Sequence, residues 1–172
     1  EVVSTREPGA GPVGQKIRRI LLDGDVISPT CELFLFLADR SNHVDSLVRP
    51  ALARRAIVLC DRFADSTIVY QGYGRGLDIE RLRVLNAEAT GGLVPDLTLL
   101  FDLPVEVGLA RQAERDRLDS ESLEFHERVR AGFLAETKRD SARYVVINAL
   151  QTAEAATRDA LNAILKRITH HA

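Results

Sequence analysis

Four short apolar runs divide the chain at intervals, and this pattern limits the possible folds more than any other feature of the sequence. Each run is almost continuously hydrophobic, which is typical of strands buried on both faces of a parallel sheet. The runs lie at residues 2–3, 57–60, 97–101 and 144–147. Longer segments between them carry apolar residues at helical spacing. Strands that alternate with helices predict an α/β fold with an open parallel sheet flanked by helices.

Helical spacing predicts a helix within each of the longer segments. The apolar stripes run from Ile17 to Leu21, Leu33 to Val48, Ile79 to Leu85, Phe125 to Phe133 and Ala156 to Ile168. Because proline and glycine disfavour helix interiors, we expect one helix to end near Pro50 and another to break at the glycines from Gly72 to Gly76. No linker, repeat or low-complexity tract interrupts the pattern, so we expect a single domain over residues 1–172.

The composition argues against several classes of protein. Lys plus Arg number 23 and Asp plus Glu 25, so the formal charge of −2 gives no support to a nucleic-acid or membrane-surface binder. No apolar run approaches the roughly 18 residues of a membrane-spanning helix. Cys31 and Cys60 lie far apart without a C-x-x-C motif, which argues against a disulfide scaffold or zinc ribbon and favours a cytoplasmic protein. The histidines lack metal-ligand spacing and are expected at the surface: His43, His126, His170 and His171.

Polar side chains follow each of the four predicted strands. They are the segment Thr5–Gly9, the pair Asp61 and Arg62, then Asp102, and finally Asn148. Open parallel sheets bind ligands outside the carboxyl ends of their strands. Each of these residues taken alone could be an ordinary loop residue or helix cap. Together they favour a binding site at one edge of the sheet.

Asp61 and Arg62 come directly after the second apolar run. In P-loop enzymes an aspartate at this place holds Mg²⁺, directly or through water. The planar guanidinium group of the adjacent arginine suits a phosphate group. The alternative interpretation is that the two residues form an internal ion pair or a helix cap.

Phe36 and Arg40 are four residues apart and therefore share one face of a predicted helix. An aromatic ring beside a cation can stack on a nucleobase and hydrogen-bond to its edge, and such stacking contributes about 1–3 kcal/mol per base. The alternative is that Phe36 is an ordinary core residue. Hydroxyl, phenol and amide groups follow the Asp-Arg pair within one short stretch: Ser66, Thr67, Tyr70 and Gln71.

An arginine-rich segment begins in a helix predicted to start near Pro104. It contains Arg111, Arg115 and Arg117, and a polar loop follows it as far as Ser122. Arginine clusters can close over a phosphoryl group during its transfer, so residues 111–122 form a candidate lid. A solvated charged face is the alternative, because acidic residues are interleaved with the arginines.

Together these segments resemble the bacterial type of thymidylate kinase, in family order from residue 2 to about residue 150. The residues that carry the resemblance are Thr5–Gly9, Phe36 with Arg40, the run Asp61–Gly76, Pro95–Leu99, and Asp116–Arg117 with Glu121–Ser122. The resemblance implies a P-loop nucleoside monophosphate kinase fold and ATP-dependent phosphorylation of dTMP to dTDP. It also implies ATP as co-substrate, Mg²⁺ as cofactor, and a homodimer.

The resemblance implies roles in recognising the nucleoside. Phe36 would stack on the thymine ring, and Arg40 would hydrogen-bond to its O4. Thr67 and Gln71 would reach the edge of the base. Tyr70 would pack under the sugar, where a ribose 2′-hydroxyl would otherwise sit, and would disfavour ribonucleotides.

The resemblance also implies roles around the phosphates. Arg62 would hold the phosphate of dTMP, with Arg18 and Ser66 nearby. Glu7 and Pro8 would line the acceptor pocket. The remaining implied positions are Arg6 near that pocket, Asp61 near Mg²⁺ with water between them, and Arg115 or Arg117 at the phosphoryl group in transfer.

Two features depart from the family pattern. The phosphate loop, G-x-x-x-x-G-K-[ST], is absent, and in the family it precedes the first apolar run on the central strand of the sheet. We therefore expect an N-terminal segment of about 30 or more residues upstream of Glu1. The arginine-rich segment is also shorter than in the family. Two alternatives stay open: a non-catalytic nucleotide-binding module, and a related deoxynucleotide kinase with another base preference.

Overall fold

The computed structural model describes residues 1–23, 26–112 and 116–171, which form two compact units. The first unit holds the described residues of 1–93 and 115–121. The second holds those of 94–114 and 122–172. Residues 116–121 therefore pack with the first unit, although the sequence on either side of them belongs to the second. The expectation of a single domain over the whole chain stays a prediction.

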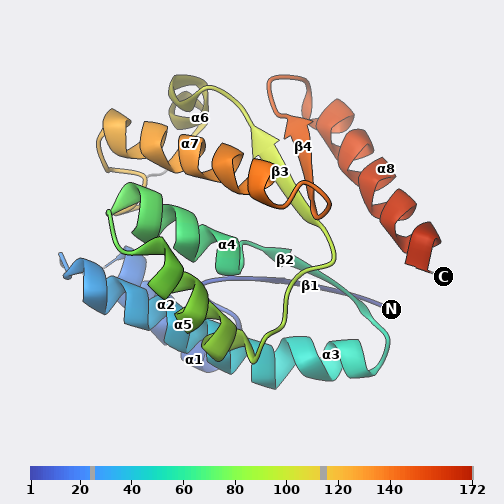
Figure 1. Cartoon of the computed structure of the whole chain (residues 1–172), viewed down its shortest axis with the longest axis horizontal. Helices are drawn as coiled ribbons and strands as arrows, with labels where there is room; N and C mark the ends of the chain where they lie inside the picture. Colours follow the sequence, from blue (N-terminus) through green and yellow to red (C-terminus); the bar gives the residue numbers. More distant parts are fainter. Residues whose placement is uncertain (24–25, 113–115, 172) are drawn as a thin grey trace. The chain divides into compact units, whose positions relative to one another are not determined.

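A two-stranded parallel sheet lies in the first unit (Figure 1). It pairs β1 (Val2–Arg6) with β2 (Ile57–Asp61), and the register joins Arg6 to Asp61 at the carboxyl end. Beyond the strands, the Glu7 N–H donates to the Asp61 carbonyl oxygen at 2.9 Å. The predicted strands are confirmed, and their pairing brings the residues after β1 beside Asp61 and Arg62.

One long helical segment runs from α2 (Pro29–His43) through the π-helical turn η1 (Val44–Val48) into α3 (Arg49–Ala53). The predicted end near Pro50 is therefore wrong. A proline in an α-helix leaves the carbonyl four residues earlier without its donor. Here the preceding turn is π-helical, and the Arg49 N–H donates to Val44, five residues earlier. This wider turn carries the helix past the proline to Ala53.

α1 (Gly11–Leu22) packs closely against α2. The two helices come close at Gly14, where an added Cβ would lie 2.5 Å from the Asp39 carboxylate. That carboxylate accepts the Gly9 N–H at 3.2 and 3.3 Å. Because a larger residue at position 14 would displace Asp39, the contact between the two helices also fixes the segment that follows β1.

The rest of the first unit contains α4 (Ala64–Thr67), the π-helical turn η2 (Ile68–Gly74) and α5 (Ile79–Thr90). A core cluster joins α2, η2 and α5 through Leu33, Leu37, Ile68 and Leu82. The predicted helix break at the glycines from Gly72 to Gly76 is confirmed, because η2 ends at Gly74. Gly72 also serves packing, because a Cβ there would lie 3.0 Å from Ile79 of α5.

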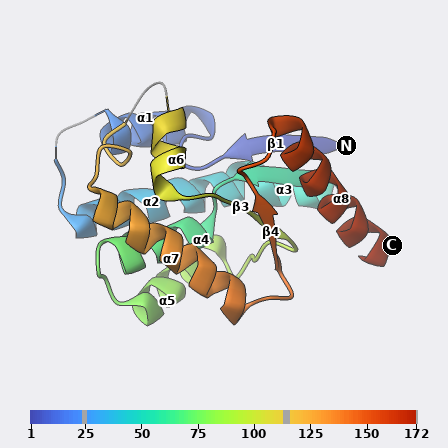
Figure 2. The same ribbon diagram turned by 90° about the horizontal axis from the view of Figure 1, so that it is seen from above.

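The second unit contains its own two-stranded parallel sheet (Figure 2). It pairs β3 (Thr98–Asp102) with β4 (Tyr144–Asn148), so Asp102 and Asn148 meet at the carboxyl end. The helices are α6 (Val105–Arg111), α7 (Leu123–Arg139) and α8 (Ala153–His171), and both α7 and α8 contact β4. Asp102 accepts two hydrogen bonds from Arg130, at 2.8 and 3.0 Å. Polar residues thus gather at the end of each sheet, and their union in one site stays a prediction.

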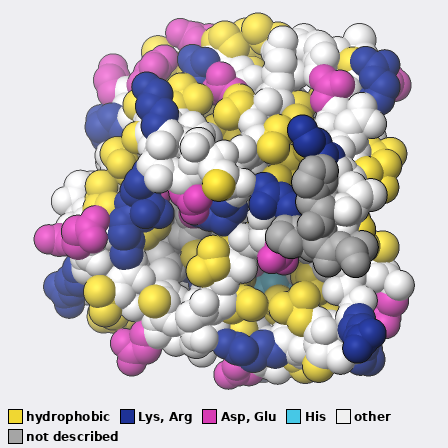
Figure 3. Space-filling view, turned by 45° about the vertical axis from the view of Figure 1, so that its right-hand side comes forward, with side chains coloured by type: hydrophobic (Ala, Val, Ile, Leu, Met, Phe, Trp, Pro, Cys, Tyr) yellow, Lys and Arg dark blue, Asp and Glu magenta, His cyan; other side chains and the backbone are white. Residues whose placement is uncertain are grey.

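Apolar side chains reach the surface among charged ones of both signs on the face shown in Figure 3. Residues along β1 and β2 alternate between exposed and half-buried positions, and Val2 and Leu59 are exposed. Burial of these two strands on both faces is therefore not observed in the described part of the chain. Within the same residues, no helix has the length and apolar character needed to cross a membrane.

Candidate functional site

One face of α2 carries a row of polar and aromatic residues at a spacing of three and four. They are Glu32, Phe36, Asp39, Arg40 and His43. All are buried except Phe36, which is half-buried. Charged groups are rarely buried without partners, so this face is expected to hold organised polar contacts rather than plain core.

Arg40 is the centre of the first group of contacts, and its side chain is fully buried. Its Nε donates to Glu7 at 2.8 Å. Its Nη1 donates to Thr67 at 2.7 Å and to the side-chain oxygen of Asn86 at 2.6 Å. Its Nη2 donates to the Phe63 carbonyl oxygen at 3.1 Å. A guanidinium group has five N–H donors, so one Nη2–H has no partner among the described residues.

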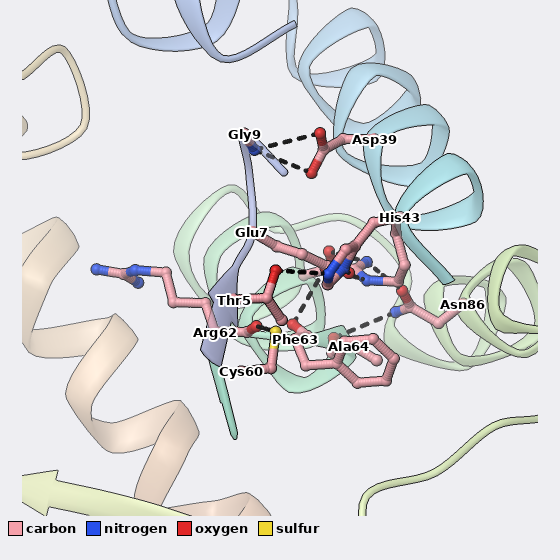
Figure 4. A network of polar contacts seen from close by, with 12 residues as sticks. Thr5, Glu7, Gly9, Asp39, His43, Cys60, Arg62, Phe63, Ala64 and Asn86 are labelled. Carbon is pink, nitrogen blue, oxygen red and sulfur yellow. Dashed lines mark hydrogen bonds and ion pairs between the residues drawn. The ribbon is translucent and has the colours of Figure 1, made fainter. Parts of the chain in front are cut away.

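Glu7 links Arg40 to His43 and is itself buried. One carboxylate oxygen accepts from Arg40, and the other lies 2.8 Å from His43 Nδ1. On its far side, His43 Nε2 lies 2.9 Å from the Thr5 hydroxyl (Figure 4). Because a carboxylate only accepts hydrogen bonds, Nδ1 carries the proton in this pair. The expectation of a surface histidine is wrong for His43, since its ring joins α2 to the end of β1.

Asp39 and Arg18 hold the segment after β1 from the other side. The Gly9 N–H donates to Asp39, and Arg18 Nη1 donates to the Pro8 carbonyl oxygen at 3.0 Å. Burial raises the pKa of Asp39 above its ordinary value, and the nearby Glu7 carboxylate acts in the same direction. Glu7 and Pro8 are therefore held in place by both α1 and α2.

Arg62 occupies a left-handed backbone conformation, with φ of 64°. Its guanidinium carbon lies 5.1 Å from the centre of the Tyr70 ring, within the range of a cation–π contact. Its side chain points away from the group formed by Glu7 and His43 (Figure 4). A non-glycine residue in this conformation carries strain of order 1–3 kcal/mol, which is typical of functional sites.

A second group of contacts surrounds Glu32, whose side chain is 1% exposed. Gln71 Nε2 donates to it at 2.9 Å, and Arg117 Nη2 at 2.5 Å. Arg75 also donates, at 3.2 and 3.3 Å, and bridges to Glu121 at 2.7 Å. Burial acts to raise the pKa of Glu32, but the hydrogen bonds from its partners outweigh it, so the pKa lies below the ordinary value.

The lowered pKa of Glu32 predicts a dependence of stability on acid. The carboxylate stabilises the fold above the ordinary glutamate pKa of 4.5, and this contribution is lost as pH falls through the lower folded value. We therefore expect the difference in unfolding free energy between the wild type and Glu32→Gln to shrink as pH drops below 4.5. Urea unfolding of both proteins from pH 7 to pH 3 measures it, and a difference that grows on acidification contradicts the assignment.

The structure brings some of the sequence-predicted residues together and separates others. Arg40, Thr67 and Glu7 are in contact, whereas Gln71 and Arg117 meet at Glu32. Arg6 and Asp61 lie exposed, side by side at the ends of their strands, and Ser66 is half-buried in α4. Arg115 lies outside the described residues.

Three contributors were missed by the sequence analysis. They are Glu32, His43 and Asn86, and each is buried. Glu32 and His43 lie on the same face of α2 as Phe36 and Arg40, and this spacing could have indicated that they belong to the site. Asn86 gave none, because an isolated amide in a helical segment looks like a surface residue.

The described residues contain no group of three or more histidine, cysteine, aspartate or glutamate side chains arranged for a metal ion. Asp61 is exposed, and no described residue donates a hydrogen bond to its side-chain carboxylate. One carboxylate oxygen combined with substrate phosphates and water is a donor set that Mg²⁺ accepts. The site therefore fits a metal that arrives with a nucleotide rather than one held by the protein alone.

Comparison with known proteins gives a consistent result. The family model described as thymidylate kinase matches residues 1–160. A thymidylate kinase of Desulfovibrio desulfuricans is 52% identical, covering 96% of this chain and 83% of the relative. One from a Synechococcus strain is 57% identical over 84% of this chain and 70% of the relative. One from Pseudomonas putida is 49% identical over 98% of this chain and 83% of the relative. The chain therefore belongs to the thymidylate kinase family, whose fold is that of the P-loop nucleoside monophosphate kinases.

Proposed function

We propose that this chain transfers the γ-phosphoryl group of ATP to dTMP and forms dTDP and ADP. A phosphate oxygen of dTMP forms the new bond to the γ-phosphorus, the bond to the β,γ-bridging oxygen breaks, and ADP leaves with those electrons. Such transfer needs little covalent chemistry from the protein. Its task is to align two anions and offset their repulsion, which suits arginines held in fixed positions.

Thymine recognition is proposed for the α2 face around Phe36 and Arg40. The half-buried Phe36 ring would stack on the base. The Nη2–H of Arg40 that has no partner among the described residues would donate to thymine O4. Thr67, whose oxygen accepts from Arg40, keeps a hydroxyl hydrogen for the base edge, and Gln71 keeps its amide oxygen. Tyr70 is proposed to lie under the deoxyribose.

Phosphate binding is proposed for Arg62, with Ser66 and Arg18 beside it. The Arg62 guanidinium lies against the Tyr70 ring, which borders the proposed sugar site, and Arg62 is exposed. Glu7 and Pro8 are proposed to line the acceptor pocket, and their anchoring by Asp39, Arg18 and His43 supports that role. The remaining proposed contacts are Arg6 at the edge of the pocket and Arg115 or Arg117 at the transferring phosphoryl group.

Mg²⁺ is the proposed cofactor, with Asp61 holding it through water. When bound, the ion would offset negative charge on the phosphates. Asp61 and Arg62 are consecutive, so the protein would place an anion for the metal next to a cation for the phosphate. A variant with Asp61→Asn should retain dTMP binding and require a higher Mg²⁺ concentration for turnover.

We also propose one kinase domain, a homodimer and a cytoplasmic location. The family model extends across both compact units, which supports one domain. Phe34 and Leu52 are exposed on the α2–α3 helical segment and could pack across a two-fold axis. The two free cysteines fit a reducing compartment.

The proposed function rests mainly on Arg40, which shares a helix face with Phe36. Its guanidinium is buried and held by hydrogen bonds, and one Nη2–H has no partner among the described residues. The test is a coupled assay with the full natural chain, ATP, Mg²⁺ and dTMP. We expect dTDP and ADP to form in equal amounts. Turnover with another monophosphate but not with dTMP contradicts the substrate assignment. Calorimetric dTMP binding without ATP consumption contradicts the kinase activity.

Arg40→Lys tests the base recognition. Lysine keeps a positive charge beside Glu7, but it lacks the planar fork that reaches several oxygens at once. Cytosine presents an amino donor where thymine presents O4, so the fixed Arg40 N–H should reject it. We expect the ratio of kcat/KM for dTMP over dCMP to fall about tenfold or more. The matched control is Arg83→Lys, at a residue paired with the exposed Glu80, and it should leave the ratio unchanged.

A further inference from the structure

Glu32 connects three separate segments of the first unit. It lies in the first turn of α2, and its carboxylate accepts from Gln71 and Arg75, which lie in and just after η2. It also accepts from Arg117, which belongs to the segment 116–121. A buried carboxylate that accepts hydrogen bonds from three side chains holds those side chains in fixed positions. Removing it would leave their N–H groups buried without an acceptor.

Two separate hydrogen bonds hold the Arg117 side chain. Its Nη2 pairs with Glu32, and its Nε donates to the Leu21 carbonyl oxygen at 2.9 Å, near the end of α1. A second bridge from the same segment joins Glu121 to Arg75, just after η2, at 2.7 Å. The segment is thus tied at both ends, by Arg117 to α1 and α2 and by Glu121 to the residue after η2.

The segment also has hydrogen bonds of its own. Asp116 accepts the N–H groups of Leu118 and Asp119 at 2.8 and 2.9 Å, and the Ser120 hydroxyl donates to the Asp116 carbonyl oxygen at 2.8 Å. These bonds hold residues 116–120 in a tight turn. Because Arg117 lies within this turn, its contacts with Glu32 and Leu21 attach the turn to α2 and α1.

We propose that Glu32 is a positioning residue that anchors the segment 116–121, and that Arg117 serves as the anchor rather than as a contact for the transferring phosphoryl group. This inference rests on the proposed kinase function and sharpens it, because it separates Arg117 from the other arginines of the predicted lid. The opposite charges of Glu32 and Arg117 and the lowered pKa of Glu32 support it.

The test compares Glu32→Gln, Arg117→Gln and the double variant with Glu80→Gln, which removes an exposed carboxylate also paired with an arginine. Amide hydrogen exchange of residues 116–121 is measured by mass spectrometry, together with kcat for dTMP phosphorylation. We expect each single variant to speed exchange in the segment about tenfold or more and to lower kcat to a similar extent. The double variant should be no worse than the stronger single one, and Glu80→Gln should match the wild type.

A loss of 100-fold or more in kcat for Arg117→Gln, with normal exchange and a normal Glu32→Gln enzyme, overturns the proposal and places Arg117 at the phosphoryl group. Additive effects in the double variant also overturn it, because they show that the two residues act independently. The exchange measurement does not depend on turnover. A wild type that forms no dTDP therefore refutes the kinase function while the exchange data still decide the role of Glu32.

Discussion

Replacing Arg62 by glycine is expected to abolish most of the kinase activity and at the same time to stabilise the backbone at that position. Arg62 has a φ of 64°, which an L-residue adopts with strain and glycine adopts freely. Loss of the guanidinium group removes a phosphate contact that aligns the acceptor, so we expect kcat to fall about 100-fold or more. Arg62→Ala should lose the same activity but keep the strain.

Comparing the two variants separates the effect of backbone strain on stability from the effect of the guanidinium group on activity. We expect Arg62→Gly to be about 1 kcal/mol more stable than Arg62→Ala in urea unfolding. Arg55 is a matched control, because it is an exposed arginine with φ of 59° and no proposed role. Arg55→Gly should relieve similar strain without affecting turnover. Near-normal activity in either Arg62 variant removes this residue from the site.

Replacing Glu7 by glutamine is expected to have the largest effect on stability. Within the described residues, Glu7 is the only carboxylate that contacts both Arg40 and His43. Removing one member of a buried, hydrogen-bonded ion pair leaves the other charge without compensation, and such changes cost about 3–5 kcal/mol. We expect the unfolding free energy to fall by that amount.

Chemical unfolding monitored by circular dichroism measures the change. Glu80→Gln is the control, since Glu80 is exposed and pairs with Arg83 at the surface, and no measurable change is expected. Glu7→Asp provides a second comparison, because it keeps the charge but shortens the reach to both partners. A Glu7→Gln protein as stable as the control contradicts the view that Arg40 depends on Glu7.

Strand positions and most helix positions followed from the sequence, because short apolar runs mark strands and apolar residues at helical spacing mark helices. The end predicted at Pro50 was wrong, since a rule about α-helical hydrogen bonds does not anticipate a π-helical turn. The break predicted at the glycines from Gly72 to Gly76 is confirmed, because glycine is disfavoured inside a helix and η2 ends at Gly74.

The candidate site was predictable where its residues adjoin recognisable segments. Arg40, Thr67 and Glu7 were singled out and are in contact. The pairing of Gln71 and Arg117 at Glu32 was not foreseeable from local pattern, because it joins residues 32, 71 and 117 through tertiary structure alone. The same holds for Asn86, which meets Arg40 across 46 positions of sequence.

The structure of this protein bound to dTMP is the most direct test of the central claim, which places the nucleotide against the α2 face of the first unit. The account predicts the thymine ring on Phe36, O4 within hydrogen-bond distance of Arg40, and the phosphate on Arg62. Nucleotide bound at a different surface, or thymine on Phe36 with its phosphate directed away from Arg62, contradicts it.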